Sequence, residues 1–157
     1  MRTKIISVMK NYLIEGAVSP KLISEFIEAM AARTDCGGHS TFIGQVRADK
    51  IDGKTVKAID YSAYESMVRN EAEQINAEIL AEFDDVKSVE LIHSTGTVNA
   101  GEISLFVLVS AGHRQQALEA CSKIVELIKE RLPVWKKEIF DDDSHVWREN
   151  SPYQSGV

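Results

Sequence analysis

The stretch that decides the fold is VNAGEISLFVLVSAGHRQQALEACSKIVELIKERL, residues 98–132. Its apolar run, from 103 to 111, is far shorter than the roughly 20 residues that cross a bilayer and is typical of a buried strand. The turn residues at 98–101 predict that this strand forms an antiparallel hairpin with a strand at 86–95. At Gly112-His113-Arg114 the chain passes into a segment with helical periodicity.

The predicted helix has apolar residues spaced about 3.6 apart, which gives it one face for burial. These residues are Ala117, Leu118, Cys121, Ile124, Val125, Ile128 and Leu132. Pro133 ends the helix, because proline disfavours helical geometry in the residue before it. The following segments VWKKEIF and VWREN are predicted to return as short strands.

Two further helices are predicted upstream. Ser19-Pro20 indicates the start of one, with a hydroxyl N-cap and proline at the first helical position. Its apolar stripe is formed by Leu22, Ile23, Phe26, Ile27 and Met30. The other helix is marked by the spacing of Met67, Val68, Ile75, Ile79 and Phe83.

The remaining strands complete the predicted fold. Residues 3–9 alternate weakly and predict an edge strand, HSTFIGQV at 39–46 is typical of a buried strand, and 56–64 predicts another, with a turn at Asp52-Gly53 between them. The expected fold is α+β, a mixed or antiparallel sheet with three main helices and hairpins between neighbouring strands. Because the chain has 157 residues, 44% of them hydrophobic, and no repeat, we expect one domain over 1–157 with 153–157 as a flexible tail.

Composition and charge exclude several classes of protein. A formal charge of −6 argues against general binding of nucleic acid, because proteins that bind the phosphate backbone present basic faces. No apolar stretch is long enough to predict a membrane span. Two distant cysteines, Cys36 and Cys121, and an opening sequence without a signal peptide favour a reducing cytoplasm.

No metal site or cofactor site is expected. The His and Cys residues show no pair at ligand spacing such as CxxC or HxxxH, and no Walker loop or dinucleotide fingerprint is present. Asp141-Asp142-Asp143 is expected to form a solvated turn. Residues 113–137, however, hold six Lys or Arg against three Glu, which makes a local basic patch in an acidic chain.

The junction Ser110-Ala111-Gly112-His113-Arg114, where a strand enters a helix, is a candidate anion site. Backbone N–H groups and the positive end of the helix dipole favour an anion there. A cation at this position opposes the dipole, and a bound anion would explain it. A hydrogen-bonded structural histidine followed by a solvated arginine explains the spacing equally well.

Three other positions are candidates. Arg47 lies where a predicted strand meets a loop, a place where scaffolds present functional groups, although a surface arginine fits the pattern too. If Lys129, in the last helical turn, and Lys136, beyond the reversal at Pro133, converge, desolvation and mutual repulsion would lower the pKa of one of them. Trp135 fits a core or interface position as well as a stacking role.

Five ordered segments carry a family resemblance: FIGQVR, IDYSAYESM, NAGE, SAGHR and IKERLPVWKKE. Together they resemble the large, catalytic subunit of molybdopterin synthase over roughly residues 41–147, and the ending P-x-W-K-K-E is the most distinctive piece. The resemblance implies an α/β hammerhead-type fold and a central homodimer with one small subunit at each end, a heterotetramer. One departure lies at His93-Ser94-Thr95-Gly96, where relatives often carry histidine-arginine before the glycine.

The resemblance also implies a reaction and its residues. In such enzymes a small ubiquitin-like subunit inserts its C-terminal glycine tail as a thiocarboxylate, and the sulfur passes to cyclic pyranopterin monophosphate. Two transfers give the dithiolene of molybdopterin. The implied catalytic residues are Lys129 and Lys136, which also bind substrate. The other implied substrate-binding residues are Gln45, Val46, Arg47, His113, Arg114, Lys137 and Glu138.

Two other classes of protein explain the same residues. A non-catalytic module would bind a small anionic metabolite or a partner tail through Arg47, His113 and Arg114. A structural dimerisation subunit would use the basic patch only to dock an acidic partner. Lys129 discriminates among them, because its replacement by Ala abolishes turnover only in an enzyme.

Overall fold

The computed structural model describes residues 12–148, so the strand expected at 3–9 and the tail at 153–157 lie outside the described residues. The elements, in chain order, are β1 (Leu13–Glu15), α2 (Pro20–Ala29), the 3₁₀ helix η1 (Met30–Ala32), β2 (Gly38–Gln45), β3 (Lys50–Ile51), β4 (Lys54–Ala63), α3 (Glu65–Glu82), β5 (Val86–Asn99), β6 (Ile103–Ala111), α4 (Arg114–Arg131), β7 (Val134–Phe140) and β8 (His145–Arg148). The fold is α+β, as predicted. In this part of the chain no helix is long and apolar enough to cross a membrane.

The hairpin of β5 and β6 forms the centre of the sheet. The two strands are antiparallel, with Ile92 opposite Phe106, and the turn between them contains Gly101 at φ 90°. Every residue of β6 after Ile103 is buried. The prediction of a buried strand in an antiparallel hairpin is therefore confirmed.

β2 pairs with the other side of β6 and not with β4. Phe42 lies opposite Val107, and β2 is the edge strand of the order β2-β6-β5-β4-β7-β8. The predicted hairpin between 39–46 and 56–64 is therefore wrong, because the polar segment after β2 pairs with β4 as β3 instead. The predicted full burial of 39–46 is wrong as well, since residues of β2 alternate between half-buried and exposed, as expected for an edge strand covered on one face.

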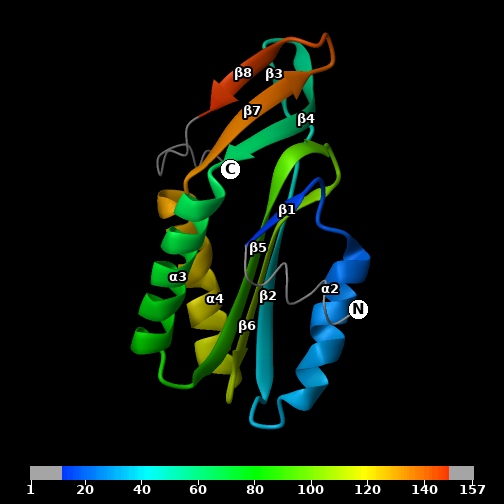
Figure 1. The fold of residues 1–157 in the computed structure, drawn as a ribbon. Helices are drawn as coiled ribbons and strands as arrows, with labels where there is room; N and C mark the ends of the chain where they lie inside the picture. The colour runs from blue at the N-terminus through cyan, green and yellow to red at the C-terminus, as the bar shows by residue number, and fades with distance from the viewer. Residues whose placement is uncertain (1–11, 149–157) are drawn as a thin grey trace.

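β5 extends beyond its predicted end and changes partners along its length. Its first part pairs with β6, residues 96–99 pair with β4, and β1 lies parallel beside residues 93–95. Gly96 has φ 73°, a conformation that glycine adopts without strain, at the point where the partner changes. β4 pairs with β7 and β7 with β8, so a smaller group of strands stands above the central sheet (Figure 1).

Helices cover both faces of the central sheet (Figure 1). Apolar residues of α3 and α4 join those of β5 and β6 in the larger core. On the other face α2 forms a second core, in which the rings of Phe26 and Phe106 lie 5.7 Å apart. Ser19 caps α2 as predicted, because its hydroxyl accepts the Leu22 N–H at 3.1 Å.

The helix stripes are narrower than their spacing predicts. Ile27, Met67 and Leu118 are 54%, 50% and 59% exposed. Each lies beside the buried face of its helix and not on it, since a helix meets a sheet along a narrow line of contact. α4 ends before Pro133, and the two short strands predicted after it are present as β7 and β8.

Candidate active site

The two predicted lysines lie on elements that meet where α4 gives way to β7. Lys129 is exposed in the last turn of α4. Beyond Pro133 the chain reverses, and Lys136 lies half-buried on β7 opposite Tyr61 of β4. Burial and then the like charge of Lys129 lower the pKa of Lys136, and the carboxylate of Glu138 opposes the shift. The two ammonium groups therefore lie within electrostatic reach of each other.

A buried, uncharged group of side chains lies beneath Lys136. The ring of Tyr61 meets His93 edge-on at 5.0 Å, and its hydroxyl donates to Ser104 Oγ at 3.0 Å. Nδ1 of His93 lies 2.8 Å from the carbonyl of Ser94, so Nδ1 carries the proton of the neutral ring. Burial, with a smaller effect of the Lys136 charge, lowers the pKa of His93 to about 4. His93 is thus neutral near pH 7 and adds no second positive charge beside Lys136.

Strand alternation along β7 sends neighbouring side chains to opposite faces. Glu138 shares the face of Lys136 and is held there by Arg148 of β8, with Nε 2.5 Å from the Glu138 carboxylate. Lys137 projects from the other face, where its ammonium lies 3.4 Å from Asp60. Of the two residues predicted to adjoin the Lys136 pocket, only Glu138 shares the Lys136 face.

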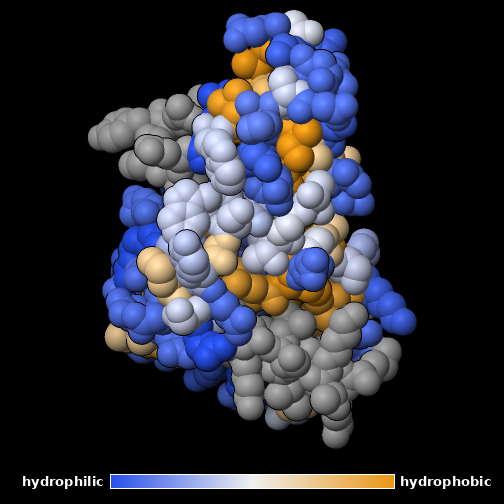
Figure 2. Space-filling view, turned by 45° about the horizontal axis from the view of Figure 1, so that its top comes forward, coloured by the Kyte–Doolittle hydropathy of each residue, from blue (hydrophilic) through white to orange (hydrophobic). Residues whose placement is uncertain are grey.

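The second face of β7 carries an aromatic groove. Trp135 and Tyr64 meet edge-on at 5.9 Å, and with Trp147, Ser62 and Ala63 they line a cavity of about 430 Å³. Trp135 is 41% exposed, so its place is a surface groove and not the core. In the space-filling view, hydrophobic patches alternate with charged residues over this end of the molecule and do not merge into one broad apolar face (Figure 2).

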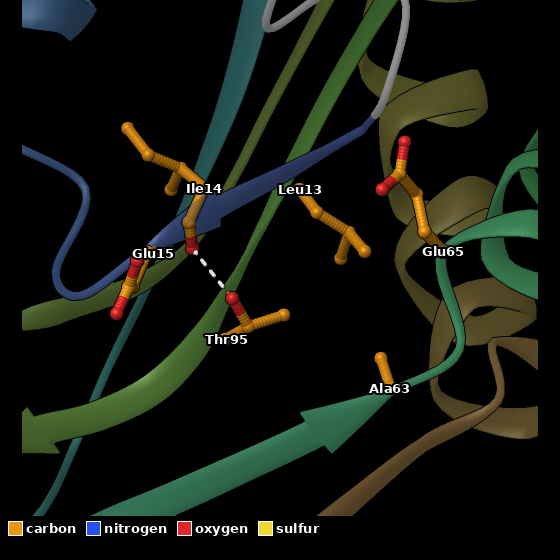
Figure 3. A pocket seen from close by; sticks show the side chains of 6 residues that line it. All are labelled: Leu13, Ile14, Glu15, Ala63, Glu65 and Thr95. Carbon is orange, nitrogen blue, oxygen red and sulfur yellow. Dashed lines mark hydrogen bonds between the residues drawn. The ribbon is translucent and has the colours of Figure 1, made fainter.

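A second cavity, of about 310 Å³, lies where β5 passes from β1 to β4 (Figure 3). It is lined by Leu13, Ile14, Glu15, Ala63, Glu65 and Thr95. In Figure 3 the side chains of Leu13 and Ile14 leave opposite sides of β1, and the hydroxyl of Thr95 donates to the carbonyl of Ile14 at 3.4 Å. None of the predicted site residues lines either cavity. The lysines therefore lie outside these two cavities.

His113 and Arg114 lie at the opposite end of α4. His113 is the N-cap residue, and both side chains are exposed. The carboxylate of Asp85 accepts the backbone N–H of His113 at 2.7 Å and lies 3.0 Å from its Nδ1, so the chain supplies an anion at this helix end itself. The hydrogen bond from the His113 ring is the main cause that lowers the pKa of Asp85. At a rise of 1.5 Å per residue, Arg114 and Lys129 are about 22 Å apart along α4.

Arg47 lies at the far end of β2. Its guanidinium pairs with Asp49 at 2.5 Å and its side chain remains 61% exposed. Gln45, the last residue of β2, is exposed. Val46 is 2% exposed and belongs to the larger core, so its side chain anchors the strand end.

The predicted site residues do not form one pocket within one chain. β2 begins beside the first turn of α4, where Gly38 packs against Arg114, and runs away from there toward Arg47. Lys129 and His113 mark opposite ends of α4. The sequence suggests a single basic patch over residues 113–137. In the structure its basic residues are spread along a helix of 18 residues, so the patch is divided between the two ends of α4.

Sequence reasoning missed Tyr61, His93 and Asp85 as parts of the candidate site. Tyr61 lies in the segment IDYSAYESM, which carried the resemblance but no site residue, and no local pattern marks Asp85. His93 had a signal, since it opens the segment that departs from the family. Ser94, where relatives often carry arginine, is fully buried, and its hydroxyl has no hydrogen-bond partner among residues 12–148. That position therefore offers the site no cation.

The described residues show no metal centre and define a basic site on an α+β scaffold. From 12 to 148, no three or more His, Cys, Asp or Glu side chains are grouped to hold a metal ion. What the structure defines is an α+β protein with a half-buried lysine near one end of α4 and a carboxylate-held histidine at the other. Residues 18–131 match the family model described as MoaE protein, and the chain belongs to the MoaE family.

Named relatives and a solved structure agree with this membership. The chain is 39% identical over 126 residues to molybdopterin synthase catalytic subunit 1 of Aedes aegypti, which covers 79% of this chain and 81% of that protein. It is 40% identical over 116 residues to the molybdopterin synthase catalytic subunit of Drosophila willistoni, covering 73% of this chain but 31% of that protein. The chain thus spans about a third of the length of the Drosophila relatives it matches.

The fold agrees with a solved member of the same group. The X-ray crystal structure of molybdopterin synthase from Staphylococcus aureus superposes with a TM-score of 0.76 and 27% sequence identity, covering 87% of this chain and 94% of that one. The predicted fold class is therefore confirmed.

Proposed function

We propose that this chain is the catalytic subunit of a molybdopterin synthase, a sulfurtransferase of molybdenum cofactor biosynthesis. It transfers sulfur from the thiocarboxylated C-terminus of a small ubiquitin-like subunit to cyclic pyranopterin monophosphate. The observation that carries the proposal is Lys136, a half-buried amine whose pKa is lowered by burial and by Lys129. Membership of the MoaE family and the names of its relatives support it.

The chemistry needs a proton carrier beside an anionic substrate. In each transfer the thiocarboxylate sulfur bonds to a carbon of the pterin side chain, replacing an oxygen substituent, and the bond from sulfur to the glycine carbonyl carbon breaks. Water attacks that carbonyl carbon, either directly or after a lysine amine has formed an amide bond to it. The partner then leaves with an ordinary carboxylate. An amine with a lowered pKa serves either route, as base or as nucleophile. We assign this work to Lys129 and Lys136.

The substrate phosphate needs cations, which the other site residues supply. Arg47, His113 and Arg114 hold the phosphate in this proposal. The remaining assigned residues act at the edges of the site: Gln45 and Val46 at the end of β2, and Lys137 and Glu138 on β7. Glu138 tempers the charge around Lys136, while Lys137 neutralises Asp60.

Two copies of the chain bring the separated residues together in this proposal. β2 is an edge strand that begins at the His113 end of α4 and ends at Arg47. Two β2 strands paired antiparallel across a two-fold axis set the Arg47 end of one chain against the His113 end of the other. The site then combines lysines of one protomer with His113 and Arg114 of its partner, inside a homodimer that binds one small subunit at each end.

Mixing two variants that are each impaired in turnover tests this shared site. Lys129→Ala and His113→Ala are purified separately, mixed, unfolded together and refolded. Random pairing makes about half of the dimers mixed, each with one intact site of two, so activity returns to about a quarter of the wild-type value. If the pocket is complete within one protomer, no activity returns.

Turnover tests the function itself. The protein is mixed with a thiocarboxylated ubiquitin-like subunit and cyclic pyranopterin monophosphate, and mass spectrometry follows pterin that contains the dithiolene. Product that disappears in Lys129→Ala, with partner affinity retained, supports the proposal. Lys123→Ala is the matched control, because Lys123 is an exposed lysine on α4 that pairs with Glu82. A folded, partner-bound wild type that makes no product would instead favour the binding module.

The cellular place and domain plan belong to the same proposal. Cys36 and Cys121 are both free thiols, which suits a reducing cytoplasm. We propose one domain for residues 1–157. Limited proteolysis of the cytoplasmic fraction, followed by mass measurement, tests both statements: a single protected fragment that spans the described residues is expected.

A further inference from the structure

The loop between α3 and β5 holds the first turn of α4 through one carboxylate. Asp85 accepts two hydrogen bonds from His113, one from the backbone N–H at 2.7 Å and one from ring Nδ1 at 3.0 Å. The side chain of Asp85 is 23% exposed, whereas that of His113 is 87% exposed. The imidazole is therefore exposed to solvent, while its Nδ1 is hydrogen-bonded to the less exposed carboxylate of Asp85.

The loop is fixed around this carboxylate. The backbone N–H of Asp85 donates to Gln116 Oε1 at 2.9 Å, and its carbonyl accepts the Gly112 N–H at 3.1 Å. Gln116 Nε2 donates in turn to Asp84 at 2.8 Å. In a capping box the third helical residue reaches back to its own N-cap, but here Gln116 reaches to the neighbouring loop. A Cβ on Gly112 would collide with the Asp85 carboxylate, so only glycine leaves room for it.

A histidine held in this way presents its other nitrogen in a defined state. With Nδ1–H donated to the carboxylate, Nε2 of the neutral ring points away as an acceptor, and in the protonated ring it is a donor to an anion. The other charged groups around the pair are Asp84 in the loop, Lys87 on β5 and Arg114 on α4. Asp85 is the one that contacts the ring.

We propose that Asp85 is a positioning residue for His113, which fixes the proton on Nδ1 and aims Nε2 at the phosphate of the substrate. The inference rests on the proposed function, which gives His113 a phosphate to bind. A loop that served only to clamp the helix would need the backbone contact alone. The second contact, to ring Nδ1, is what assigns Asp85 a role through the imidazole.

Nuclear magnetic resonance of the histidine ring tests the pairing without any turnover. Asp85→Asn keeps an oxygen for the backbone N–H but loses the charge. We expect the neutral His113 ring to lose its preference for Nδ1–H, because the amide no longer offers a charged acceptor to that proton. Asp84→Asn is the matched control, since Asp84 contacts Gln116 and not the ring, and it should keep the wild-type tautomer.

Kinetics then test whether the pairing reaches the substrate. In Asp85→Asn the KM for cyclic pyranopterin monophosphate should rise about fivefold while kcat changes little, because one aimed donor to phosphate weakens. In a His113→Ala background the same change should add nothing, as expected for a residue that acts through the ring. An unchanged His113 tautomer, or a changed tautomer with an unchanged KM, overturns the proposal.

Failure of the proposed function gives a different result. If the wild-type protein shows no turnover, His113 has no established phosphate to bind, and the kinetic experiment shows no product for any variant. The resonance arm would still report whether Asp85 fixes the ring. A loss of the α4 clamp would show separately, as a lower melting temperature of Asp85→Asn by circular dichroism.

Discussion

The two ends of α4 place basic side chains in opposite surroundings. At the C-terminal end, Lys136 is half-buried beside Lys129 and above the neutral His93, so its pKa is lowered. At the N-terminal end, His113 is exposed and contacts the carboxylate of Asp85. The C-terminal end of α4 thus lies beside an amine with a lowered pKa, and the N-terminal end carries an imidazole held by a carboxylate. Burial with a like charge favours a reactive amine, and exposure with an opposite charge favours a fixed binding group.

The largest expected effect comes from removing the reactive amine. Lys136→Met should lower kcat about 10²- to 10⁴-fold, the usual contribution of a general acid or base. Lys136→Arg should fail equally, because guanidinium keeps its proton at any working pH. Turnover at saturating substrate measures both variants.

A charge-matched control separates chemistry from simple loss of charge. Lys57→Met removes an exposed lysine of the neighbouring strand β4 that pairs with Asp143, and should keep near wild-type turnover. High activity in Lys136→Arg would show that positive charge, and not a neutral amine, is what the lysine end provides.

Acid should destabilise the lysine end through His93. Burial lowers the pKa of His93 from 6.5 to about 4, so between these pH values the unfolded chain binds a proton that the folded chain refuses. Stability therefore falls as pH drops from 6.5 to 4, by about 3 kcal/mol. Above pH 6.5 the effect is absent, because both states are neutral.

Glu90, on the same strand, should mask this loss. Burial raises its pKa to about 7, with Arg33 opposing, so the folded chain keeps a proton that the unfolded chain releases between pH 4.5 and 7. Stability from this group falls as pH rises, again by about 3 kcal/mol. The free energy of unfolding of the wild type, measured with urea, should be nearly constant from pH 4.5 to 6.5. In Glu90→Gln the free energy of unfolding should fall as the pH drops over this range. The same pH dependence in the two proteins would contradict the assignment.

The stability of the His113 end of α4 should depend more on steric fit than on charge. Gly112→Ala places a Cβ against the Asp85 carboxylate and should cost about 1–3 kcal/mol of unfolding free energy, as overpacking does. Thermal and urea unfolding measure the loss. In an Asp85→Ala background the same change should cost clearly less, since the clash is gone. Equal costs in both backgrounds would show that another contact excludes the methyl group.

The smallest effect is expected at Arg114. It is exposed on the first turn of α4, so Arg114→Gln should leave stability unchanged and raise the KM for the pterin phosphate about fivefold, the loss of one charged hydrogen bond in solvent. Lys123→Gln, the same charge change in the middle of α4, should leave the KM unaltered. A similar rise of the KM in both variants would show that Arg114 contributes only to the general electrostatic potential of the protein.

Local pattern predicted the elements and missed most of the pairings. Ser19-Pro20, the apolar run of β6 and Pro133 set element ends that the structure confirms, because capping, burial and proline geometry act within a few residues. The hairpin between 39–46 and 56–64 failed, since strand neighbours are chosen by the whole sheet. The separation of Lys137 from Lys136 follows from strand alternation once β7 is known to be a strand.

The sequence by itself determined the fold class, the helices, the central hairpin and the family, since each depends on local periodicity or on ordered motifs. Only the tertiary structure decided that Tyr61 and His93 lie beneath Lys136, that Asp85 holds His113, and that the two groups lie toward opposite ends of α4. The physical reason is that the charge state of a side chain depends on solvent exclusion and on neighbours a few ångströms away. Those neighbours come from segments 28 to 75 positions distant, a separation that no local pattern encodes.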